Sequence, residues 1–158
     1  MDFDTAFKRL LGFEGGFSDN PSDTGGATRF GVTEAVARSH GYTGEMSALP
    51  VDTAKAIYRA DYWDKCRCEE LPDQVRYSVF DAAVNSGPGQ AVKWLQAAVG
   101  AKPDGVIGPA TLAALNAVPV EVLRSRINGA RLGFMTTIPS WGVFSKGWAR
   151  RIASLLTD

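Results

Sequence analysis

The stretch FDTAFKRLLGFEGG, residues 3–16, decides how the chain begins to fold. Its apolar side chains recur at helical spacing from Phe3 to Leu10, and Glu14 occupies the next position of this stripe. The spacing predicts an amphipathic helix over residues 2–13 that ends at two glycines, which permit a sharp exit. A carboxyl group on an apolar face favours its neutral form. Its pKa then rises, and it can hold a proton near neutral pH as a general acid.

A turn-rich stretch, FSDNPSDTGGATRFG at residues 17–31, follows this helix and predicts tight turns or a small β-hairpin. It supplies Asp23 and Thr28. Two carboxyl groups in unlike surroundings can cleave a glycosidic bond, with one as acid and the other ionised. Glu14 would be the acid, Asp23 the ionised partner and Thr28 the residue that holds a water. The residues alone also allow a purely structural alternative, in which both carboxylates accept hydrogen bonds only from nearby backbone N–H groups.

Helix signals dominate the rest of the chain. Asp52 and Asp73 are predicted N-caps, while Pro88, Pro109 and Pro119 suit first helical turns. The predicted helices span residues 33–39, 52–62, 73–84, 88–99, 109–117, 119–136 and 142–156. The third of these is apolar almost all round, so we place it at the centre of the fold.

The expected fold class is therefore mainly α, with a short β-hairpin or an irregular turn-rich segment after the first helix. At 158 residues the chain is long enough for one domain with its own core. We expect a single domain over residues 1–158, with a catalytic lobe at 1–87 and a helical lobe at 88–158.

The amino-acid composition limits the kinds of partner and cofactor that we expect. Seventeen basic and seventeen acidic residues give a formal net charge of +0, so we expect no nucleic-acid partner. Cys66 and Cys68 accompany a single histidine, His40, and we expect two ordinary thiols, no metal site and no cofactor. The N-terminus lacks the features of a signal peptide, and no apolar run is long enough to span a membrane. We expect a monomer that does not insert into membranes.

Longer motifs add a resemblance. Glu14-Gly15-Gly16-Phe17 and then PSDTGGATRFGVT at residues 21–33 closely resemble the opening motif of glycoside hydrolase family 108, the phage-type N-acetylmuramidase endolysins. The likeness continues through YRADYW at 58–63 and FDAAVNSG at 80–87. WLQ at 94–96 and DGVIGPAT at 104–111 resemble the predicted peptidoglycan-binding region that accompanies this family.

The resemblance implies a lysozyme-like helical domain that cleaves the β-1,4 bond between N-acetylmuramic acid and N-acetylglucosamine in bacterial peptidoglycan. The resemblance also implies that the glutamate of the family motif is catalytic, and this residue corresponds to Glu14. The order Glu14, Asp23, Thr28 also looks like the catalytic triad of another class of phage lysozymes. Family members often carry Asn-Asp before the proline, whereas Asp19-Asn20 stands here, so the second carboxylate is expected to be Asp23. An endolysin of this type would wait in the host cytoplasm until a membrane-permeabilising partner releases it to the wall.

Substrate contacts are predicted for three further residues. Phe30, in the turn-rich stretch, is the best aromatic candidate for a sugar contact. Asp81 and Asn85 lie one helical turn apart. Their side chains either form hydrogen bonds with neighbouring loop backbone, or they line the cleft and form hydrogen bonds with an N-acetyl group or a sugar hydroxyl. Two other functions remain open at this stage: a lytic transglycosylase, and a non-catalytic module that binds the cell wall.

Overall fold

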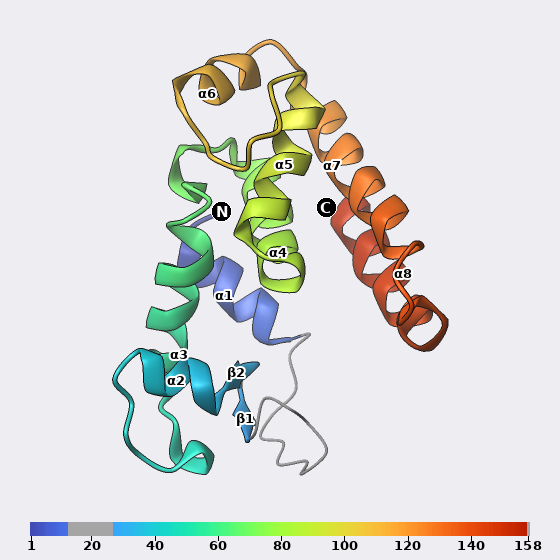
Figure 1. The fold of residues 1–158 in the computed structure, drawn as a ribbon. Helices are drawn as coiled ribbons and strands as arrows, with labels where there is room; N and C mark the ends of the chain where they lie inside the picture. The colour runs from blue at the N-terminus through green and yellow to red at the C-terminus, as the bar shows by residue number, and fades with distance from the viewer. Residues whose placement is uncertain (13–26, 158) are drawn as a thin grey trace. The chain divides into compact units, whose positions relative to one another are not determined.

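The computed structural model describes residues 1–12 and 27–157 (Figure 1). The chain forms two compact units, one of residues Asp2–Asp61 and the other of Met1 with Tyr62–Asp158. Helices dominate both units, and the strands described are two short ones after the first helix. The predicted mainly α fold class is therefore confirmed.

The described residues of the first unit form three short helices and a hairpin. Its elements are α1 (Phe3–Leu11), β1 (Thr28–Arg29), β2 (Val32–Thr33), α2 (Glu34–Ser39), a 3-10 turn (Met46–Ala48) and α3 (Val51–Tyr58). A π-helical turn, Arg59–Trp63, follows α3 and leads into the second unit.

Helix α1 has the predicted apolar stripe. Phe3, Phe7 and Leu10 are all buried, and the Phe7 ring lies 5.5 Å from the Tyr58 ring of α3, measured between centroids. The helix is shorter than predicted, however. It ends at Leu11, and the N–H of the C-cap residue Gly12 donates a hydrogen bond to the Arg9 carbonyl at 3.1 Å.

Helix α3 corrects a predicted cap. Asp52 was expected to be the N-cap, but the helix begins at Val51 and Pro50 precedes it in an extended conformation. Asp52 instead lies in the first turn, where a carboxylate interacts favourably with the helix dipole. The regular helix also ends at Tyr58 rather than at Tyr62. In contrast, the helix predicted from residue 33 has Thr33 as its N-cap, since the Thr33 hydroxyl oxygen accepts a hydrogen bond from the Val36 N–H at 3.4 Å.

The second unit is a helical bundle. After a 3-10 turn (Cys68–Glu70) come α4 (Asp73–Ser86), α5 (Pro88–Val99), α6 (Pro109–Leu115), α7 (Val120–Met135) and α8 (Trp141–Thr157). Two prolines open α5 and α6 as predicted, whereas Pro119 lies one residue before α7. Asp73 is likewise not a cap but the first residue of α4, after Pro72.

Helix α4 is the centre of this unit, as its apolar sequence predicts. It packs against α5 and α7, and α8 packs on α7 (Figure 1). Every residue from Tyr77 to Ala83 is buried. The Trp63 and Phe80 rings meet edge to face at 5.3 Å between centroids, a favourable aromatic geometry.

Candidate active site

The two predicted catalytic carboxylates, Glu14 and Asp23, lie outside the described residues. Among the other predicted site residues, Thr28 and Phe30 belong to the hairpin of the first unit, whereas Asp81 and Asn85 belong to the C-terminal half of α4 in the second unit.

The hairpin forms where the turn-rich sequence predicts it. Thr28 pairs with Thr33 and Arg29 with Val32, in antiparallel register. The two residues between the strands both have positive φ, 52° at Phe30 and 74° at Gly31. Positive φ at both positions is typical of the tight two-residue turn whose twist matches that of the strands. Thr28 is therefore fixed on a paired strand, directly opposite Thr33.

Phe30 adopts a left-handed conformation, which is sterically unfavourable for a bulky side chain. Contacts on both sides hold it. The hydroxyl of buried Tyr58 donates a hydrogen bond to the Phe30 carbonyl at 3.0 Å. The guanidinium carbon of Arg29 lies 5.0 Å from the centroid of the Phe30 ring, within cation–π range. The backbone of Phe30 is thus tied to α3, and its half-buried ring lies against the Arg29 guanidinium.

Asp81 is the centre of a buried ion cluster. Its side chain is 0% exposed. One carboxylate oxygen accepts a hydrogen bond from Arg131 of α7 at 2.5 Å, and the other accepts one from Arg151 of α8 at 2.7 Å. Both oxygens are therefore engaged by arginine rather than by loop backbone. The sugar contact predicted for Asp81 has no route in this structure, because no part of its side chain is exposed.

Arg131 is also 0% exposed, and burial lowers its pKa while the Asp81 carboxylate acts in the opposite direction. Its Nε and Nη2 atoms have no hydrogen-bond partner among the described residues. The Asp81 carboxylate is thus an essential counter-charge for an arginine inside the bundle. Sequence reasoning missed both arginines, although a carboxylate on an otherwise apolar helix does signal a buried cation.

Asn85 lies one turn further along α4 and is exposed. Its side-chain amide donates to the backbone carbonyl of Asp81 at 3.0 Å. This bond stays within the helix, so the exposed amide of Asn85 remains at the surface, where a ligand can reach it.

The segment of residues 100–111 is held by one buried glutamine. The Gln96 amide nitrogen donates to the Asp104 carboxylate at 2.7 Å and to the Thr111 hydroxyl at 3.2 Å, and its oxygen accepts the Gly105 N–H at 2.8 Å. Gly105 has a φ of +85°, which favours glycine. This segment leads into α6, which Pro109 opens as predicted.

Acid should weaken this turn. The hydrogen bond from Gln96, and next the bond from the Val106 N–H, lower the pKa of Asp104. A carboxyl pKa that is lower in the folded state stabilises the fold above the ordinary carboxyl pKa of about 4, and this contribution is lost as the pH falls through the folded value. We expect Asp104→Asn to destabilise the protein at pH 7 and to have a smaller effect near pH 3. Urea unfolding of both proteins at the two pH values measures this; equal differences would contradict the assignment.

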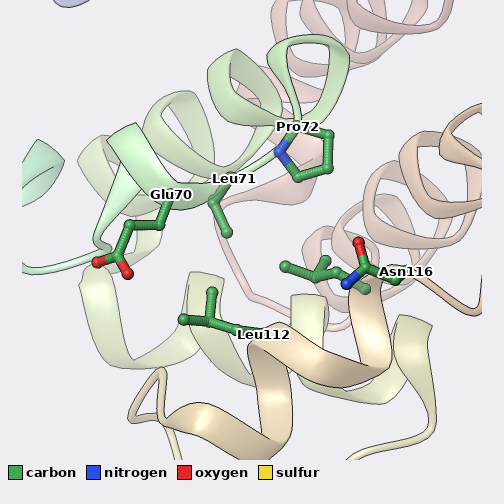
Figure 2. Close-up of a pocket in the computed structure, with 6 residues that line it drawn as sticks. Glu70, Leu71, Pro72, Leu112 and Asn116 are labelled. Atoms are coloured by element: carbon green, nitrogen blue, oxygen red, sulfur yellow. The ribbon is translucent and has the colours of Figure 1, made fainter.

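A pocket of about 390 Å³ lies between the start of α4 and α6. Figure 2 shows Leu71, Pro72 and Leu112 around it, with the side chains of Glu70 and Asn116 at its edges. Arg67 binds both oxygens of the Glu70 carboxylate at 2.5 Å. These bonds lower the pKa of Glu70 and keep it ionised at the edge of the pocket.

Neither cysteine is disulfide-bonded, and both thiols are buried. A hydrogen bond with Cys66, and next burial, raise the pKa of the Cys68 thiol, so it stays protonated at neutral pH. Within residues 1–12 and 27–157, three or more metal-ligating side chains do not gather at any point. In the same residues, no helix combines the length and apolar character needed to cross a membrane.

Comparison with known proteins identifies the family to which the chain belongs. Residues 7–87 match the sequence model of Glycosyl hydrolase 108, and residues 90–153 match that of the Predicted Peptidoglycan domain. The chain therefore belongs to glycosyl hydrolase family 108 and is a glycoside hydrolase that acts on peptidoglycan.

Among solved structures, the chain is similar to the one described as the structure of Brucella abortus SagA. The two are 36% identical, the match covers 98% of this chain and 91% of that one, and the TM-score is 0.87. This similarity supports the expected lysozyme-like fold. No curated protein matches the chain closely enough to count as a relative.

Proposed function

We propose that this peptidoglycan hydrolase is an N-acetylmuramidase with Glu14 as its general acid. The observation that carries the proposal is the match of residues 7–87 to a glycosyl hydrolase family, because these residues include Glu14 in its Glu-Gly-Gly-Phe motif. The bond cleaved is the β-1,4 bond between N-acetylmuramic acid and N-acetylglucosamine.

In the proposed reaction, the bond between the anomeric carbon of N-acetylmuramic acid and the bridging oxygen breaks. Glu14 gives its proton to that oxygen, which leaves as a hydroxyl of N-acetylglucosamine. Water supplies the hydroxyl that joins the anomeric carbon, and Asp23 accepts the water's proton. Thr28, fixed on its paired strand, would hold this water.

Each unit has one surface group that is suited to contact the glycan strand. Phe30 presents a half-buried ring at a turn that Tyr58 holds in place. Asn85 presents an exposed amide at the end of α4, and amide groups both donate to and accept from N-acetyl groups and hydroxyls. Asp81 takes a different role, in which it fixes α7 and α8 against α4 through its two arginines.

The masses of the reaction products test this function against its two rivals. Digestion of purified sacculi should release fragments with N-acetylmuramic acid at a reducing end, each carrying the added mass of water. A lytic transglycosylase would give anhydro products that lack this mass. A module that only binds the wall would release no fragments at all. Mass spectrometry of the soluble fraction separates the three outcomes.

We further propose that the enzyme acts as a phage-type endolysin and works as a monomer. It would be held in the host bacterial cytoplasm until a membrane-permeabilising partner lets it reach the wall. Light scattering tests the monomer. Fractionation of producing cells before and after membrane permeabilisation tests the location; finding the protein already at the wall beforehand would contradict it.

A further inference from the structure

The first half of α8 carries three aromatic side chains on one face. Trp141, Phe144 and Trp148 follow at spacings of three and four residues, so they lie on successive turns of the same side. The centroids of the Phe144 and Trp148 rings are 5.6 Å apart, and those of Trp141 and Trp148 are 6.2 Å apart. We call these three residues the ring row.

The ring row continues the stripe by which the second half of α8 packs against the protein. On the same face, Ile152 is 2% exposed and Leu155 is 3% exposed. Phe144, in contrast, is 54% exposed, and the two tryptophans are only half-buried. The apolar face of α8 is therefore covered along its second half and open along its first half.

The opposite face of α8 argues against a flat membrane surface as the partner. Lys146 and Arg150 are exposed there, beside the 78% exposed Val143. A helix that lies on a membrane lowers its broad apolar face into the lipid and keeps its charges on the other side. Here the rings lie on the same face as the buried Ile152 and Leu155, beside the rest of the protein. A single extended polymer chain fits such a position better than a flat bilayer does.

We propose that the ring row is a stacking surface for the sugar rings of the peptidoglycan glycan strand. In a β-1,4-linked strand each pyranose presents C–H groups on its two faces, and these pack well on aromatic rings. The ring row lies within residues 90–153, which match the Predicted Peptidoglycan domain. The inference rests on the proposed function in one respect, namely that the glycan strand is the substrate. It adds the place at which residues 90–153 would bind that strand.

Binding to sacculi in the Glu14→Gln background tests the proposal without digestion of the substrate. Phe144→Leu and the double variant Phe144→Leu/Trp148→Leu keep apolar side chains but remove rings. We expect the Kd measured by co-sedimentation to rise about threefold for the single variant and about tenfold for the double variant. Val143→Ala is the matched control, since it alters an exposed apolar side chain on the other face of the same helix; its Kd should not change.

Two further ligands identify what the rings bind. Glycan strands freed of their stem peptides should show the same loss of affinity, and phosphatidylglycerol vesicles should show no difference between variants. The proposal is overturned if the ring variants bind sacculi as tightly as the Val143→Ala control, or if stripped strands show no loss. It is also overturned if the loss appears with vesicles instead, or if light scattering shows that the substitutions break a dimer.

Thermal unfolding checks that each variant is folded, and if the double variant is not, the exposed Phe144→Leu decides alone. Failure of the proposed function would look different. In that case the Glu14→Gln protein would still release reducing ends from sacculi, while the contrast between ring variants and control could still be measured by sedimentation in the cold.

Discussion

Glu14→Gln should reduce the release of reducing ends from purified sacculi by about 10²–10⁴-fold, the usual contribution of a general acid. The substitution keeps the shape of the side chain but removes the proton that the bridging oxygen needs. Without that proton the departing sugar would leave as an alkoxide, a poor leaving group. The measurement is the initial rate of reducing-end formation at saturating sacculi, so that a change in binding does not enter the comparison.

Glu45→Gln is the matched control for this experiment. Glu45 is an exposed glutamate in the same unit, and its side chain makes no capping hydrogen bond to the turn that follows it. Its replacement by glutamine should leave the rate within about twofold, because surface substitutions rarely disturb a fold. Equal rates for the two variants would remove Glu14 from the mechanism.

Asp81→Asn should destabilise the protein by about 3–5 kcal/mol, because it leaves a buried arginine without its counter-charge. Asp81 and Arg131 are both 0% exposed, so water cannot replace the lost partner. Arg151 of α8 loses the same carboxylate. The free energy of unfolding from urea titration at pH 7 measures the effect, which we expect to be the largest of any single polar substitution in α4.

Asp73→Asn provides the comparison on the same helix. Asp73 also pairs with positive groups, the N-terminal ammonium of Met1 and the guanidinium of Arg76, but its side chain is 63% exposed. Exposed ion pairs contribute about 0–1 kcal/mol. If both variants lost the same small free energy, the buried cluster would not stabilise the bundle as we infer.

Much of the fold could be predicted because its signals are local. The apolar stripe of α1, the hairpin at residues 28–33 and the prolines that open α5 and α6 all follow from spacing or from turn residues. Boundaries were less secure where neighbouring residues carry similar signals. Pro50 and Asp52 both suit the start of a helix, and the sequence does not say which of them precedes the first turn.

The polar contacts of Asp81 and of Phe30 were not predictable, because their partners are far apart in the chain. Asp81 meets Arg131 and Arg151 across 50 and 70 residues. Tyr58 reaches the Phe30 carbonyl across 28 residues. Helical spacing identifies which face of an element is buried, but it carries no information on which distant side chain completes a polar pair.

The role of Glu14 as a proton donor is tested most directly with an aryl β-glycoside, in which a phenol replaces the sugar that leaves from the anomeric carbon of N-acetylmuramic acid. The phenolate of an acidic phenol departs without protonation, so this substrate does not need the general acid. We expect the Glu14→Gln protein to lose about 10²–10⁴-fold on sacculi but less than about tenfold on the aryl glycoside. Equal losses on the two substrates would contradict a proton transfer from Glu14 to the departing sugar.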